Sequence, residues 1–118
     1  MKTFLVAIAT LGLAATFANC DDVELLGMKA KEWKYFDGKA EPKGWEGPKF
    51  DDAKWKTGQA ILGYGDPGLN TEISFGDNDN AKHLCAFFRR TIDVKNPKEF
   101  KAIIAKLICD DGCVVYLN

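Results

Sequence analysis

The side chains that most often carry catalysis are scarce in this sequence. The 118 residues contain one histidine, His83, and one serine, Ser74, and no Gly-x-Ser-x-Gly turn surrounds that serine. Cys85 follows His83 by two residues and shares its face of a strand, but no third group is evident that would orient the histidine. Adjacent carboxylates occur at Asp51-Asp52 and Asp110-Asp111, yet adjacency in a turn does not provide the separation of about 5 Å or more that glycoside hydrolysis needs. We therefore expect that this chain is not itself an enzyme.

Two loops carry residue types that suit ligand binding. Trp45 lies in a proline- and glycine-rich loop over residues 41–48, where an exposed indole could stack on a sugar ring. Tyr64 and Asp66 lie in a glycine-rich loop and could supply a second ring and an acceptor for hydroxyl groups. Each has a structural alternative, which is a plug from loop to core for Trp45 and a tight turn for residues 63–68.

Asp110 and Asp111 are further candidates for binding sugar hydroxyls or Ca²⁺. The stronger alternative is turn chemistry, because aspartate side chains in an Asp-Asp-Gly turn accept hydrogen bonds from the backbone. Asp77 and Asp79 alternate with asparagines as in part of a Ca²⁺ loop, but no glutamate follows at the spacing of an EF-hand. No cofactor is predicted, and Ca²⁺ is the one ion that the pattern suggests.

The first 18 residues have the pattern of a secretory signal peptide. A lysine at position 2 precedes an apolar run of about 14 residues, which is shorter than the roughly 20 that a membrane-spanning helix needs. A cut after Ala18 or after Cys20 fits the small residues there. We expect a secreted, extracellular protein with no membrane span and with one module over residues 21–118. With 16 basic and 17 acidic residues, the chain offers no excess positive field for nucleic acid.

The four cysteines suit an oxidising compartment. A cut after residue 18 keeps all four, which is an even set that two disulfides would use. Cys109 and Cys113 flank the Asp-Asp-Gly turn, where a bridge across a hairpin is geometrically allowed. The competing arrangement pairs one of them with Cys85, and Cys20 completes the set. One such spacing with a single histidine is a weak zinc pattern.

Short β-strands separated by long loops dominate the rest of the pattern. Residues 33–36 and 83–94 read as strands, and Asp-Asp-Gly joins two more, over 103–109 and 113–118, in a hairpin. In the strand 83–94, Leu84, Ala86, Phe88, Ile92 and Val94 share one face, broken only by Arg90, so we expect this strand to lie inside a sheet. Arg89 and Arg90 point to opposite faces, and at most one of them should be buried, paired with a structural carboxylate.

Single helical turns are expected at two places. Asp51 or Asp52 should cap one turn over residues 50–55, with Phe50 and Trp55 on its inner side, and Asn96-Pro97 should begin another that runs to Phe100. The pattern predicts an all-β fold, an antiparallel β-sandwich with short helical turns. Because the sequence stops in mid-strand at Asn118, we expect the sandwich to be incomplete at its C-terminus and the chain to be a fragment.

The order of these motifs resembles the galactose-binding-like jelly-roll modules of secreted multidomain proteins. The similarity covers nearly all of the chain after the signal peptide and rests on Gly44-Trp45, Phe50-Asp51-Asp52-Ala53-Lys54-Trp55, Leu62-Gly63-Tyr64-Gly65-Asp66, Phe87-Phe88-Arg89-Arg90-Thr91-Ile92-Asp93-Val94 and Asp110-Asp111-Gly112-Cys113-Val114-Val115-Tyr116-Leu117-Asn118. Such modules accompany phosphoesterase, glycosidase or adhesion domains, so the resemblance implies an accessory role. The cysteines at the last turn depart from the family pattern and suggest a local staple there.

Three functions follow from this interpretation. The first is a non-catalytic module that binds carbohydrate or extracellular matrix through Trp45, Tyr64, Asp66, Asp110 and Asp111. The second is an N-terminal supporting domain of a secreted hydrolase such as a metallophosphoesterase, with the catalytic domain downstream in the parent protein. The third is a structural component of an extracellular or mineralised matrix, for which the balanced charge gives weak support.

Overall fold

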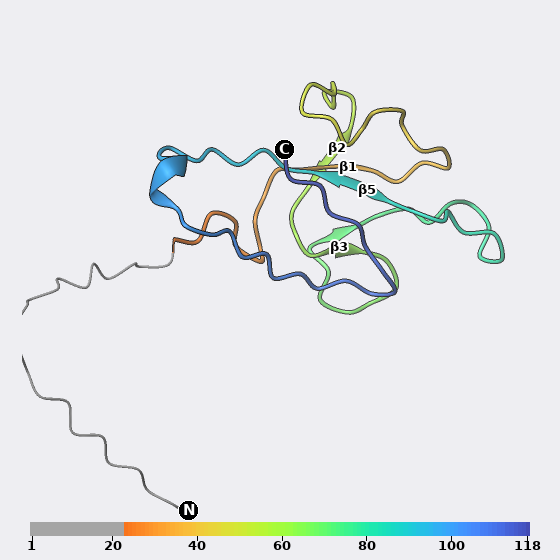
Figure 1. Cartoon of the computed structure of the whole chain (residues 1–118). Helices are drawn as coiled ribbons and strands as arrows, with labels where there is room; N and C mark the ends of the chain where they lie inside the picture. Colours follow the sequence, from red (N-terminus) through yellow and green to blue (C-terminus); the bar gives the residue numbers. More distant parts are fainter. Residues whose placement is uncertain (1–22) are drawn as a thin grey trace, which may run out of the picture.

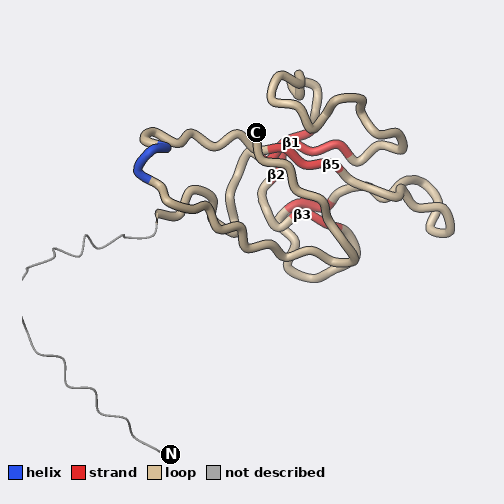
Figure 2. Tube along the Cα trace, in the orientation of Figure 1, coloured by secondary structure: helices blue, strands red, loops and turns tan. Residues whose placement is uncertain are grey.

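The structure is a computed structural model that describes residues 23–118. The expected signal peptide and Cys20 lie outside the described residues. Within them the chain is mostly loop and β-strand, with no α-helix (Figures 1 and 2). The elements are β1 (Trp33–Phe36), β2 (Lys56–Gly58), β3 (Leu62–Gly63), β4 (Thr71–Glu72), β5 (Phe87–Arg89) and the 3-10 helix η1 (Pro97–Glu99).

A three-stranded antiparallel sheet forms the centre of the fold, in the order β2-β1-β5. β1 has the sequence Trp-Lys-Tyr-Phe, whose aromatic side chains favour extended backbone, so the prediction of a strand over 33–36 is confirmed. In this register Lys34 lies opposite both Thr57 of β2 and Arg89 of β5. β3 and β4 form a separate parallel pair. A small antiparallel sheet in a mostly β chain is therefore present, and the part of the chain that is described shows no sandwich of two packed sheets.

Aromatic rings cover one face of the sheet. Phe36 and Phe87 are cross-strand partners with ring centroids 6.4 Å apart, and Phe87 is buried. Trp55 packs on Phe36 at 5.8 Å and on Phe50 at 5.4 Å, as expected for two residues on the inner side of their turn. Such tilted and edge-to-face pairs are favourable beyond the area that they bury. They hold the loop over residues 45–55 against β1 and β5.

A buried carboxylate connects the sheet to the chain after β4. Asp37 is 7% exposed, and its two oxygens accept hydrogen bonds from Lys56 Nζ at 2.8 and 2.9 Å. The backbone N–H of Ser74 also donates to Asp37 Oδ2 at 2.8 Å, and the ring Nδ1 of His83 lies 2.7 Å from the Asp37 carbonyl oxygen. Ile73, next to Ser74, is one of the buried apolar residues. Asp37 thus joins segments that are up to 46 residues apart.

The strand expected over residues 83–94 is reduced to Phe87–Arg89, and it lies at the edge of the sheet rather than inside it. Leu84 is 98% exposed, whereas Phe87 from the opposite face is buried. The reason is the length of the partner: β1 has four residues, so only three cross-strand pairs form with β5. The aromatic layer lies on the side of Phe87, and no layer covers Leu84.

The predicted hairpin over residues 103–118 does not form either. Residues 101–118 contain no strand, and all of them are exposed. The chain bends at Asp110-Asp111, where Asp111 rather than Gly112 has a positive φ of 68°. Because the two arms make no ladder with each other or with the sheet, their apolar side chains gain no covering layer.

Of the two predicted helical turns, the one over residues 50–55 is wrong and the one that begins at Pro97 is confirmed. At residues 51–55 the chain makes a non-helical turn, in which Asp51 Oδ1 accepts a hydrogen bond from the Ala53 N–H at 3.0 Å. The second turn is η1, with Pro97 at its first position as expected, but the Asn96 side chain makes no capping hydrogen bond.

Replacing Asp37 by Asn should destabilise the fold by about 1–3 kcal/mol at pH 7, since a neutral amide then replaces the buried carboxylate that accepts hydrogen bonds from Lys56 and from the Ser74 N–H. Burial raises the pKa of Asp37, but the hydrogen bonds from Lys56 and Ser74 outweigh it and leave that pKa below its ordinary value. Because folding lowers this pKa, Asp37 contributes its full stabilisation when the pH is above its unfolded-state pKa of about 3.9. The stabilisation is lost as the pH falls through the folded-state pKa. Urea unfolding between pH 7 and pH 2 should show this loss in the wild type and a weaker acid dependence in D37N.

The exposed Asp77 provides a matched control, and Asp77→Asn should leave the free energy of unfolding nearly unchanged. Equal unfolding curves for wild type and D37N at pH 7 would contradict the role given to Asp37.

Candidate binding cleft

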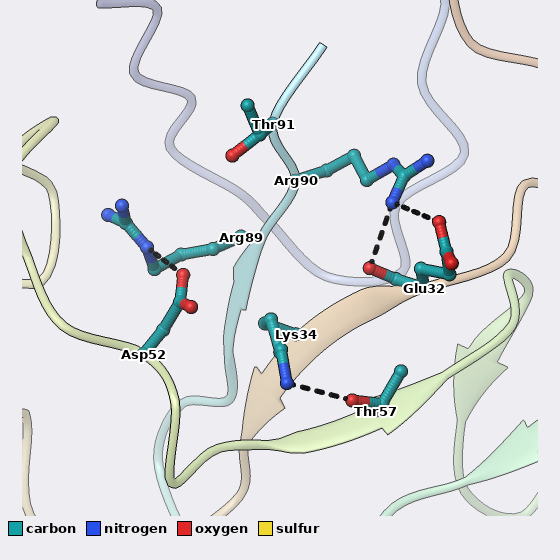
Figure 3. A pocket seen from close by; sticks show the side chains of 7 residues that line it. All are labelled: Glu32, Lys34, Asp52, Thr57, Arg89, Arg90 and Thr91. Atoms are coloured by element: carbon teal, nitrogen blue, oxygen red, sulfur yellow. Dashed lines mark hydrogen bonds and ion pairs between the residues drawn. The ribbon is translucent and has the colours of Figure 1, made fainter.

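The register of the antiparallel sheet creates a row of polar side chains. Thr57, Lys34 and Arg89 are direct cross-strand neighbours on β2, β1 and β5. Side chains alternate along a strand, so these three share the face on which Phe36 and Phe87 form the aromatic layer further along. A cleft of about 370 Å³ lies at this polar end of the face (Figure 3). It is lined by Glu32, Lys34, Asp52, Thr57, Arg89, Arg90 and Thr91.

Arg89 forms one wall of the cleft and anchors the loop that precedes β2. Its Nε donates to Asp52 Oδ2 at 2.8 Å, and its Nη1 donates to the carbonyl oxygens of Trp45 and Gly47, the latter at 3.1 Å. The guanidinium also lies 5.3 Å from the centroid of the Phe50 ring. Only a planar guanidinium can make this set of contacts. The expectation that one of the two arginines pairs with a structural carboxylate is confirmed for Arg89.

Arg90 and Glu32 form the opposite wall. Arg90 Nη1 donates to Glu32 Oε2 at 3.1 Å and to the Glu32 carbonyl oxygen at 3.2 Å. Glu32 has a φ of 62°, in the left-handed region that residues other than glycine rarely adopt. The Nε of Arg90 is buried and has no hydrogen-bond partner among the described residues. This wall therefore combines a strained backbone with an unsatisfied donor.

Lys34 lies between the two ion pairs, as Figure 3 shows. Its Nζ donates to Thr57 Oγ1 at 3.1 Å, and no carboxylate in the described part of the chain pairs with it. The cleft has donors in its three cations and acceptors in two carboxylates and two hydroxyl groups, but no histidine, cysteine or serine lines it. Such a set can hold a polar ligand by hydrogen bonds.

The residues predicted for sugar binding do not line this cleft, and their role in binding stays a prediction. Trp45 is half-buried, its ring packs on Phe87 at 5.1 Å and on Tyr116 at 5.6 Å, and its indole N–H donates to Glu41 Oε1 at 3.0 Å. These contacts fit the alternative of a plug from loop to core, and sugar binding by Trp45 stays a prediction.

Tyr64 packs in a different cluster. Its ring lies on Phe75 at 5.0 Å, with Lys82 Nζ at 5.0 Å from its centroid, and Asp66 beside it is exposed. Trp45 and Tyr64 therefore do not share one rim.

The turn at Asp110 and Asp111 is exposed, and one of its side chains accepts a hydrogen bond from its own backbone. The Asp111 N–H donates to Asp110 Oδ1 at 2.9 Å, which is the local turn chemistry given above as the stronger alternative. None of the five residues predicted for binding lines the cleft. No group of three or more histidine, cysteine, aspartate or glutamate residues suited to a metal ion occurs among residues 23–118.

The cysteines of the described part are free thiols. Cys85, Cys109 and Cys113 are all exposed, and no disulfide joins them. A hydrogen bond with the Cys113 side chain is the main cause that raises the pKa of the Cys109 thiol, so these two thiols are neighbours across the turn. The bridge between Cys109 and Cys113 remains a prediction, as do the pairings that involve Cys85 and Cys20.

Arg89 and Asp52 were expected to have structural roles rather than to line a binding site, and no role was predicted for Lys34 or Thr57. The alternation in Trp-Lys-Tyr-Phe does place Lys34 on the face opposite Tyr35. The pattern does not reveal which residues pair with Lys34 across the strands, because cross-strand pairing joins residues far apart in the chain. In the structure Thr57 and Arg89 lie on either side of that lysine.

No protein-family model matches this chain, and neither the curated proteins nor the solved structures contain a match. Within residues 23–118 no helix has the length and apolar character to cross a membrane.

Replacing Arg89 by Lys should lower the free energy of unfolding by about 1–3 kcal/mol, because lysine cannot bond Asp52, Trp45 and Gly47 together. The loop should also loosen, which would change the fluorescence of Trp45 before global unfolding. Denaturant titrations followed by tryptophan fluorescence and by circular dichroism measure both effects.

The matched control is Arg90→Lys, which changes a partly exposed ion pair and should cost less than about 1 kcal/mol. A result in which R90K is as destabilising as R89K would show that Arg89 has no special anchoring role.

Proposed function

We propose that this chain is a secreted, non-catalytic module that binds carbohydrate, such as the glycans of an extracellular matrix, in the cleft between Arg89 and Arg90. The observation that carries the proposal is the composition of the cleft wall, which has hydrogen-bond donors and acceptors on three adjacent strands and strand ends. A sugar hydroxyl both donates and accepts, so a wall with cations, carboxylates and threonine hydroxyls matches it. Secretion is proposed from the signal-peptide pattern of the first 18 residues.

The ligand would lie across the row Thr57, Lys34 and Arg89. Arg89 is fixed by its own contacts with Asp52 and the loop backbone, so one side of the site is rigid before any ligand arrives. A preorganised wall reduces the entropy lost on binding. Trp45 helps to fix this wall, since Arg89 donates a hydrogen bond to its carbonyl oxygen and its ring packs on Phe87 of the same strand.

We propose further that the sheet β2-β1-β5 belongs to a galactose-binding-like jelly-roll sandwich. Two features support this: the order of motifs along the sequence, and the central aromatic strand paired on both sides in antiparallel fashion. In such a sandwich the apolar residues of 103–117 would supply strands of a covering layer.

Replacing Thr57 and Thr91 by Val removes two hydroxyl groups from the cleft at nearly constant volume. We expect the double variant to bind glycans about 5- to 150-fold more weakly than the wild type, since each of the two lost hydrogen bonds is worth about 0.5–1.5 kcal/mol. A glycan array identifies the strongest ligand, and isothermal titration calorimetry then compares the two proteins. The Tyr64→Ala, Asp66→Asn variant is the control, because its residues lie outside the cleft.

Loss of binding in the control variant with retention in T57V/T91V would place the site at the glycine-rich loop instead. An array without any bound glycan would refute the proposed function.

A second candidate is a supporting domain at the N-terminal side of a secreted hydrolase. The observation that favours it is a ribbon of exposed apolar side chains, which a partner domain could cover. These are Ile103, Ile104, Leu107, Ile108, Val114, Val115 and Leu117, each between 59% and 78% exposed.

Intact mass and peptide mapping of the protein from its source test this second candidate. Peptides continuous with this chain that carry histidine and aspartate metal motifs would support it, and we would then expect the catalytic partner to cover the ribbon. A native mass equal to that of this chain after removal of the signal peptide would contradict it.

A further inference from the structure

The charges in the cleft do not cancel. Two carboxylates, Glu32 and Asp52, face three cations, Lys34, Arg89 and Arg90, and so one positive charge remains. The arginines each hold one of the carboxylates at 2.8 and 3.1 Å. The excess charge therefore lies on Lys34, in the middle of the row.

The environment of Lys34 differs from that of its neighbour in the sheet. Lys56 of β2 lies on the other face and is paired with the Asp37 carboxylate at 2.8 Å, which raises the pKa of Lys56. Lys34 lies on the central strand and is half-buried. Within residues 23–118 the only hydrogen-bond partner of its side chain is the neutral hydroxyl of Thr57. The hydrogen bond between these two side chains is exposed, so an anionic group that enters the cleft from solvent can reach the Lys34 ammonium.

The neighbouring wall also has more donors than acceptors. Arg90 uses Nη1 for Glu32, while its buried Nε has no acceptor in the described part of the chain. Glu32 holds this position with a φ of 62°, a backbone conformation that costs free energy. An acceptor group entering the cleft beside Lys34 would meet an electrostatic field that favours negative charge.

We propose that the ligand of the cleft is an acidic saccharide whose single anionic group binds beside Lys34, with Thr57 as the adjacent hydroxyl partner. This rests on the proposed function, since it names the class of sugar for the same site. The anionic group is a uronic acid carboxylate or a sulfate ester on the sugar ring. Neutral hydroxyls of the same sugar would meet Asp52 and the two arginines.

The test compares three ligands of equal length by isothermal titration calorimetry. These are a galactose trisaccharide, a galacturonic acid trisaccharide and the galactose trisaccharide with one sulfate ester. We expect one or both acidic ligands to bind at least about tenfold more tightly than the neutral one, because a hydrogen bond to a charged group is worth about 1.5–3 kcal/mol. The preference should shrink as salt is raised from 50 to about 500 mM.

Lys34→Met keeps the length of the side chain and removes its charge. It should weaken the preferred acidic ligand about tenfold more than it weakens the neutral trisaccharide, because only the acidic ligand loses a charged partner. Lys54→Met, at an exposed lysine outside the cleft, is the matched control and should bind like the wild type. Circular dichroism confirms folding of each variant, and Lys34→Gln replaces Lys34→Met if the latter does not fold.

The outcomes separate this inference from the proposed function. Equal binding of neutral and acidic trisaccharides, or an acidic preference that survives K34M and K34Q, would overturn the role of Lys34 while leaving a carbohydrate-binding cleft. Failure of all three ligands, together with an empty glycan array, would overturn both.

Discussion

The pairing of β1 with two antiparallel neighbours is the constraint on which the rest of the structure depends. It fixes Lys34 between Thr57 and Arg89, and Phe36 beside Phe87, in a single register. Because side chains alternate along a strand, a shift of one residue would exchange the two faces of β1. The aromatic layer and the polar cleft would then both be lost, so the site and the core are specified by the same hydrogen bonds.

Polar contacts attach segments to the sheet that a larger apolar core would hold in other domains. Only Tyr35, Ile73 and Phe87 are buried apolar residues in the part of the chain that is described. Asp37 fastens the segment after β4 to the sheet, and Arg89 fastens the loop before β2. Both side chains satisfy backbone groups as well as an opposite charge, which is the condition under which a buried ion is tolerated. The loops around the cleft are thus held by directed bonds.

This arrangement separates two kinds of surface. At the cleft, charges are held in place by their partners and leave Lys34 without a counter-ion among residues 23–118. Over residues 103–117, apolar side chains are exposed with no layer on them. The first surface suits a small polar ligand, and the second suits another protein layer, so binding and support are compatible roles for one module.

The sequence by itself determined the local elements, because these depend on neighbouring residues. The aromatic strand 33–36, the loop at 41–48 and the turn beginning at Pro97 follow from side-chain preferences and from the fixed φ of proline. The sequence also indicated that one arginine would pair with a carboxylate. Tertiary structure alone decided that Phe87 rather than Leu84 is buried and that the Trp45 ring packs on Phe87. It also decided that Lys34 and Thr57 line a cleft. Those outcomes depend on the register and length of strands about 20 to 55 residues apart, which local periodicity does not encode.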